Sequence, residues 1–164
     1  MSADNPQILV GAGSAGVYYG VQGRATQRVV PTLAKLADDY LAAGATQPTI
    51  CIDLGGATWI DSTFAGWLVG MHKRIGGGLQ LANCGERCRI SLERLQLNGR
   101  FTLTELAPPP ELRSVNCATS DRPDRAALEL MLAAHEALAG VDAQNQRIFG
   151  PITQVLRSQL EAKA

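Results

Sequence analysis

Three consecutive residues, Asp61, Ser62 and Thr63, place an acid and two hydroxyls together just after a Gly-rich turn. The run 50–54 before this turn is apolar and predicts a buried strand, whereas the run from Ser62 to Arg74 predicts an amphipathic helix. Asp and Ser are favoured at helix starts because their side-chain oxygens accept backbone N–H groups that lack partners inside the helix. The sequence therefore predicts the Ser62 hydroxyl at a helix N-terminus beside a carboxylate, a position suited to a phosphate.

Ser62 has alternative roles that this position allows. As a helix cap alone, it would stabilise the helix by about 1 kcal/mol. As a phosphorylation site, it would gain a charge of about −1.5 to −2, which the helix start tolerates but Asp61 and a desolvated partner surface do not. As a hydrolytic nucleophile it would need a nearby base, yet no G-x-S-x-G motif surrounds it and His72 lies about three turns along the same helix. The sequence favours the phosphorylation site, and it predicts no catalytic residue and no enzyme.

The segment from residue 53 to 74 resembles the STAS domain of anti-sigma factor antagonists, whose pattern is roughly D-L-S-x-V-x-F-I-D-S-[ST]-G-L-G-x-L. The residues that carry this resemblance are Asp53, Leu54, Trp59, Ile60, Asp61, Ser62, Thr63, Gly66, Leu68, Lys73 and Arg74. The chain departs from the pattern at Phe64, where the family usually has Gly, and at Ala65, where it has Leu. Phe64 adds bulk beside the phosphorylation site, which affects the choice of partner more than the fold.

This resemblance implies a protein that switches between partners. The serine matching Ser62 would be phosphorylated by an anti-sigma factor serine kinase, with Thr63 as the second-choice acceptor, and a PP2C-type phosphatase would reset it. The residues expected to contact the partner are Arg24, Asp61, Ser62, Thr63, Phe64 and Trp67. One alternative within the same fold is a STAS scaffold subunit of a signalling or transporter complex, in which Ser62 is never phosphorylated.

A second motif, Gly11 to Gly16, satisfies the G-x-G-x-x-G fingerprint of dinucleotide-binding proteins, and Asp38 and Asp39 follow at roughly the distance of the ribose-binding acid. Such a site needs a helix that begins inside the motif. The next residues, 17–21, are instead β-branched and aromatic, which predicts a strand. We therefore expect a loop between two strands and no cofactor, and a nucleotide-binding enzyme remains the alternative from a different class.

The order of elements predicts an α/β fold, ββαβαβαβ, with a mixed central sheet packed with helices as in STAS domains. The expected strands are 8–10, 17–21, 50–54, 79–82 and 101–104, and the expected helices are 29–41, 62–75 and 87–97. The predicted divisions are a STAS-like domain at 1–105, a Pro-rich linker at 106–121 and a C-terminal helical hairpin at 122–164.

The C-terminal hairpin is predicted from two apolar stripes on either side of Gly140. The first stripe is Leu128, Met131, Leu132, His135 and Leu138, and the second is Ile148, Ile152, Val155, Leu156 and Leu160. Asp121 or Asp124 can cap the first helix, and Pro151 is expected in the first turn of the second helix or at a kink. The stripes need a surface to cover them: the sheet of the same chain, a second copy in a homodimer, or another partner.

The overall composition argues against several classes of function and location. Lys and Arg number 15, as do Asp and Glu, so the formal net charge of zero argues against nucleic acid as a partner. No apolar run approaches the roughly 20 residues of a membrane span, and the N-terminus lacks a signal-peptide pattern, so a cytoplasmic protein is expected. The four cysteines lack the spacing of a metal site and are expected to be reduced. His72 and His135 are interpreted as packing residues, and Trp59 is expected under the loop that precedes Ser62.

Overall fold

A mixed sheet forms the centre of the molecule, as the sequence predicted. The computed structural model describes residues 5–13, 16–117 and 122–163. The strands are β1 (Gln7–Ala12), β2 (Val17–Ala25), β3 (Ile50–Asp53), β4 (Ala57–Ile60), β5 (Leu79–Ala82), β6 (Thr102–Thr104) and β7 (Arg113–Asn116). Their spatial order is β6-β5-β3-β2-β1-β7, and β4 pairs with the C-terminal end of β2. β1 is antiparallel to both β2 and β7, and the other pairs are parallel.

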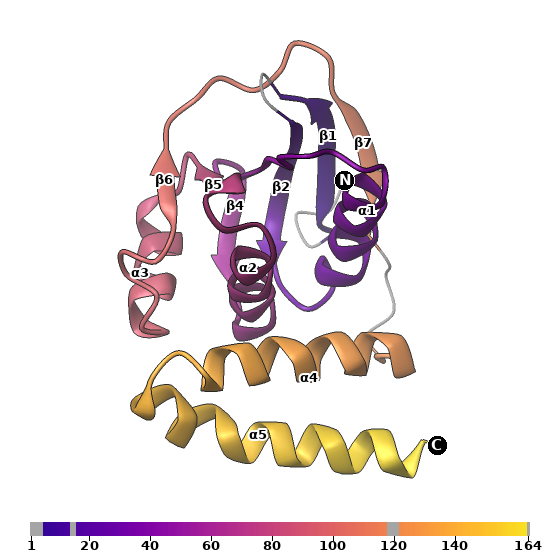
Figure 1. Ribbon diagram of the computed structural model, residues 1–164, viewed down its shortest axis with the longest axis vertical. Helices are drawn as coiled ribbons and strands as arrows, with labels where there is room; N and C mark the ends of the chain where they lie inside the picture. The colour runs from indigo at the N-terminus through magenta and orange to yellow at the C-terminus, as the bar shows by residue number, and fades with distance from the viewer. Residues whose placement is uncertain (1–4, 14–15, 118–121, 164) are drawn as a thin grey trace.

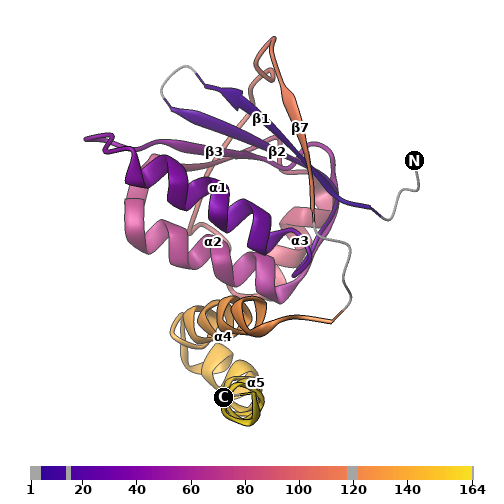
Figure 2. The same ribbon diagram turned by 90° about the vertical axis from the view of Figure 1, so that its right-hand side faces the viewer.

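The helices surround this sheet unevenly. They are α1 (Val30–Ala42), α2 (Ser62–Ile75), α3 (Glu86–Arg94), α4 (Arg125–Ala139) and α5 (Ala143–Ala162), with a 3-10 turn, η1 (Gly76–Gly78), after α2. α1 and α2 lie side by side on one face of the sheet, and α3 contacts β4 (Figure 2). α4 crosses below α2, and α5 lies on the outer side of α4 (Figures 1 and 2). No helix among the described residues is both long and apolar enough to cross a membrane.

The sheet has two faces of different character because successive side chains on a strand point in opposite directions. Ile50, Ile52, Leu79 and Leu81 point toward α1 and α2 and belong to the main hydrophobic core. The residues between them, together with Tyr18, form the opposite face, where Cys51 and Ala82 pack against Leu106. Burial raises the pKa of the Cys51 thiol to about 11, which keeps it protonated at neutral pH.

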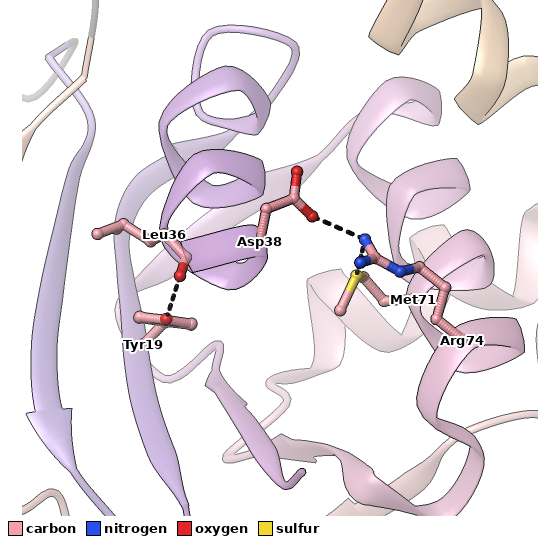
Figure 3. Close-up of polar contacts among 5 residues, drawn as sticks. All are labelled: Tyr19, Leu36, Asp38, Met71 and Arg74. Atoms are coloured by element: carbon pink, nitrogen blue, oxygen red, sulfur yellow. Dashed lines mark hydrogen bonds and ion pairs between the residues drawn. The ribbon is translucent and has the colours of Figure 1, made fainter. Parts of the chain in front are cut away.

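Polar contacts join α1 to its neighbours (Figure 3). The Tyr19 hydroxyl of β2 donates to the Leu36 carbonyl at 2.9 Å, and Arg74 of α2 forms an ion pair with Asp38 of α1 at 2.8 Å. The other acid of the ribose hypothesis, Asp39, forms an ion pair with Lys35. Both acids are therefore engaged on the surface of α1. Exposed pairs of this kind add little stability, and only the pair between Arg74 and Asp38 joins α1 to α2.

The G-x-G-x-x-G motif begins with Gly11 and Ala12 in β1, and its described residues belong to the connection of a β-hairpin, in agreement with the prediction of two joined strands. β1 and β2 pair antiparallel from Ala12 with Val17, and the Gly13 N–H donates to the Gly16 carbonyl at 2.7 Å. Gly16 also lies against the Thr49 carbonyl, where an added Cβ would collide with backbone. Because β2 begins at Val17, the element that follows the motif is a strand and not a phosphate-binding helix. Residues 14 and 15 lie outside the described part of the chain.

Two strands differ from the sequence-based prediction. β4 lies in the segment expected to be a turn, where it pairs in parallel with β2 and leads directly into α2. β7 lies inside the predicted linker at 106–121 and pairs with β1, so the strand at Thr102–Thr104 is not the last. β7 is an edge strand whose residues are mostly exposed, so it lacks the apolar alternation that identifies a strand in a sequence. Trp59 on β4 is 44% exposed and does not pack under the loop as expected.

The C-terminal hairpin forms, but the prediction of its second apolar stripe was wrong in part. Asp124 caps α4 by accepting from the Ala127 N–H, whereas Asp121 lies outside the described residues. α5 begins at Ala143, with Asp142 as its cap, so Pro151 sits in the helix interior and not in its first turn. The side chains that α5 buries are Asn145, Phe149, Thr153, Leu156 and Leu160, whereas Ile148, Ile152 and Val155 are 47%, 38% and 57% exposed.

Candidate functional site at the start of helix α2

Asp61 fixes the start of α2. It follows β4 with extended backbone, φ −95° and ψ 175°, and its Oδ1 accepts the Phe64 N–H at 2.8 Å. Its Oδ2 accepts the Gln27 N–H at 2.9 Å, and its backbone carbonyl accepts the Ala65 N–H at 3.0 Å. One residue thus caps the helix and ties it to the segment between β2 and α1. Sequence reasoning considered Ser62 for this cap role, and that interpretation is wrong, because Asp61 is the cap and Ser62 is the first residue of the helix.

The Asp61 carboxyl is held in a largely buried position. Burial raises its pKa, and this effect exceeds the opposing effect of the N–H groups of Phe64 and Gln27 and of the nearby His135 imidazole. The Thr63 N–H also hydrogen-bonds to this carboxyl and lowers its pKa. The carboxylate is therefore costly to ionise, although it is surrounded by donors. A second negative charge placed next to it would increase this cost.

Ser62, the first residue of α2, forms a hydrogen bond with a residue 73 positions away. Its Oγ lies 2.9 Å from Nε2 of His135 on α4. The other ring nitrogen of His135, Nδ1, lies 2.7 Å from the Met131 carbonyl, which can only accept. In the neutral imidazole Nδ1 therefore carries the proton, and Nε2 accepts from the Ser62 hydroxyl. The imidazole is 5% exposed, with its ring centroid 5.8 Å from that of Phe149.

Sequence reasoning assigned His135 to packing and missed its contact with Ser62. The packing interpretation itself is correct, since the ring is buried beside Phe149. Nothing in the residue spacing connects α4 to the start of α2, because this contact depends on how the hairpin is placed. The only signal in the sequence was the position of His135 on the first apolar stripe, among side chains expected to be buried. The other histidine, His72, packs its ring at 85° to the ring of Phe101.

A hydroxyl hydrogen-bonded to an oriented imidazole is the nucleophile–base half of a hydrolytic site. The other half is a pair of N–H groups that stabilise the oxyanion. At this helix start the N–H groups of Thr63, Phe64 and Ala65 are already hydrogen-bonded to Asp61. His135 is therefore the nearby base that the sequence did not reveal, so that objection to a nucleophile was wrong, whereas the N–H groups of this helix start are already engaged.

The other residues predicted to contact a partner are not all at the surface. Thr63, Phe64 and Trp67 are buried, with Phe64 and Trp67 in contact at a ring-centroid distance of 6.3 Å. Arg24 is exposed on β2 and pairs in register with Trp59 of β4. Sequence reasoning did not include Trp59 in the contact set, although its large exposed side chain lies beside Arg24.

The site has no group of metal ligands. Across residues 5–13, 16–117 and 122–163, no cluster of three or more His, Cys, Asp or Glu side chains could hold a metal ion. The four cysteines, Cys51, Cys84, Cys88 and Cys117, are buried free thiols. Neither a protein-family model nor a curated protein sequence matches the chain.

Proposed function

We propose that this chain is an anti-sigma factor antagonist of the STAS type. In this proposal an anti-sigma serine kinase binds the start of α2 when Ser62 is free and dissociates when Ser62 is phosphorylated, and a PP2C-type phosphatase restores the free serine. The protein would act in the cytoplasm. The observation that carries the proposal is the position of Ser62 as the first residue of α2, directly after the N-cap Asp61.

The electrostatics of this position support a switch by charge. A phosphate would add a charge of about −1.5 to −2 next to the Asp61 carboxyl, whose pKa burial already raises. The capping bonds of Asp61 come from backbone N–H groups, which a phosphate on Ser62 leaves in place. The fold would therefore survive phosphorylation, whereas an interface formed over Ser62 would lose affinity.

The test is purification of the chain from its native host, followed by mass spectrometry of the phosphate and of the proteins that co-purify. We expect a phosphate on Ser62 and a serine kinase in the complex, retained by Ser62→Ala and lost with Ser62→Asp. Ser114→Asp is the matched control because Ser114 is exposed on β7. A phosphate on Thr63, or none on either residue, would contradict the assignment.

A second candidate is the scaffold subunit in which Ser62 is never modified. One observation favours it: the Ser62 hydroxyl already has an internal partner, the buried imidazole of His135. For this candidate, Ser62→Asp and Ser62→Ala should give the same set of co-purifying proteins. The candidate would be rejected by any phosphate on Ser62 in the native host.

A further inference from the structure

The hairpin formed by α4 and α5 covers the face of α2 that the proposed partner would use. An added Cβ on Gly66 of α2 would collide with the Ala134 backbone of α4, so the two helices approach as closely as a glycine allows. A cavity of about 160 Å³ between α1, α2 and α4 has Trp67, Leu130 and Ala134 in its lining. The predicted contact residue Trp67 is only 8% exposed for this reason.

His135 makes this covered arrangement sensitive to the chemistry of Ser62. Nε2 of His135 accepts the Ser62 hydroxyl proton at 2.9 Å, and a phosphorylated Ser62 has no such proton to donate. The N–H groups of Thr63 and Phe64, which could otherwise bind a phosphate, are taken by Asp61, whose carboxyl would also repel the added charge. A phosphate at Ser62 therefore removes the hydrogen bond to His135 and adds repulsion from Asp61, which weakens the docking of the hairpin.

The hairpin has one anchored end, which gives it a pivot. Near the turn between its helices, Asn145 Nδ2 donates to the Leu95 carbonyl at 2.9 Å and Arg100 donates to the Val141 carbonyl at 3.3 Å. Leu138 and Phe149 at this end belong to the main core. The opposite end forms a separate cluster of Leu128, Leu156 and Leu160. The free end has Leu130 at the edge of the main core and this cluster of its own, so we expect undocking from α2 to begin there while the turn stays attached.

We propose that the hairpin α4–α5 is an intramolecular competitor of the partner: it occupies the α2 face by contacting the free Ser62 hydroxyl through His135 and, like the partner, it leaves when Ser62 carries a phosphate. The identity of the partner, a serine kinase, rests on the proposed function. The hairpin and this partner both bind the chain in which Ser62 is free, so the partner must displace the docked hairpin, and a phosphate on Ser62 excludes both. The apparent affinity for the partner equals the intrinsic affinity multiplied by the fraction of molecules in which the hairpin is undocked.

Hydrogen exchange of the full chain tests the docking without any partner. In Ser62→Asp we expect the amides of α4 to exchange at least about tenfold faster than in the wild type, because a buried hydrogen bond is replaced by a charge. β3 and β5 should keep their protection, and Ser114→Asp should leave α4 unchanged. Equal or stronger protection of α4 in Ser62→Asp would overturn the proposal, since the hairpin would then tolerate or bind the charge.

A second measurement tests occlusion from the side of the hairpin. In a Trp59→Phe background, Trp67 is the single tryptophan, and its quenching by acrylamide reports exposure of the α2 face. Ala134→Gln should raise the quenching constant about twofold or more, because Ala134 lies against Gly66. Ala126→Gln on the exposed side of α4 should not change it. Equal quenching in both variants would overturn the occlusion.

These outcomes separate the two proposals. If α4 loosens in Ser62→Asp but no kinase co-purifies from the host, the competing hairpin stands and the partner assignment fails. If Ser62 is phosphorylated in the host but α4 stays protected in Ser62→Asp, the phosphorylation site stands and the competing hairpin fails.

Discussion

The two ends of the C-terminal hairpin differ in what holds them. The turn end inserts Leu138 and Phe149 into the main core and adds the Asn145 hydrogen bond to Leu95. The free end is a small cluster of its own, around Leu128 and Leu156. The contact between Ser62 and His135 lies between these ends. A polar contact between a region packed into the main core and a region with a small cluster of its own can change the docking of a hairpin without unfolding the domain.

The largest expected difference between the two ends comes from matched leucines on α4. Leu138 and Leu128 are both buried. Leu138→Ala should lower the free energy of unfolding of the whole chain by about 2–5 kcal/mol, because it leaves a cavity in the main core. Leu128→Ala should cost less in global unfolding and should instead increase hydrogen exchange locally in α4 and α5. Chemical denaturation gives the first quantity, and equal global losses would erase the distinction.

The polar anchor of the turn end gives a smaller effect. Asn145 is fully buried, and its Nδ2 is the donor to Leu95. Asn145→Ala leaves that carbonyl without its donor and should cost about 1–3 kcal/mol. Asn116→Ala, at an exposed position on β7, is the control and should stay within about 0.5 kcal/mol. If thermal unfolding shows equal losses for the two variants, the turn end is not anchored by this bond.

The sequence predicted those elements whose apolar spacing repeats regularly. Ile50 to Leu54 and Leu79 to Ala82 were placed within a residue, and α2 was placed at its correct start, although sequence reasoning considered Ser62 and not Asp61 as the cap. β7 could not be recognised because an edge strand buries few side chains. β4 could not be recognised because Gly55 and Gly56, just before it, indicate a turn.

The sequence predicted only the part of the candidate site that depends on residues close together in the chain. Asp61 and Ser62 lie where the helix-start pattern placed them. His135 enters through the packing of α4 on α2, which has no counterpart in residue spacing. The second stripe was misassigned for a related reason. Ile148 and Val155 are apolar, yet α5 turns Asn145 and Thr153 inward because Asn145 finds an acceptor on Leu95.

The pH dependence of stability tests the effect of burial on the Asp61 carboxyl, which caps α2 beside the contact between Ser62 and His135. Because the folded-state pKa of Asp61 is raised, the folded chain binds a proton there more tightly than the unfolded chain. Stability from this group is therefore greatest below the unfolded pKa of about 3.9 and falls as pH rises through the folded pKa. Asp61→Asn keeps a capping side chain and should flatten this part of the profile, with a change of under about 1 kcal/mol at neutral pH. Denaturant midpoints across pH 3–7 measure it, and parallel wild-type and variant profiles would contradict the effect of burial.

The smallest expected effect is at the exposed stripe of α5, where Ile148, Ile152 and Val155 face away from the core. Ile152→Ser should change the free energy of unfolding of the single chain by no more than about 0.5 kcal/mol, because the side chain is already partly in water. If the C-terminal helices instead form a homodimer, this stripe is the apolar surface available to it, and the substitution should shift sedimentation toward the monomer. Leu156→Ser on the buried side of α5 should act in the opposite way, with a loss of stability that does not depend on protein concentration. A wild-type chain that sediments as a monomer at all concentrations, with Ile152→Ser unchanged, would leave the free end of the hairpin held by α2 contacts and its own cluster alone.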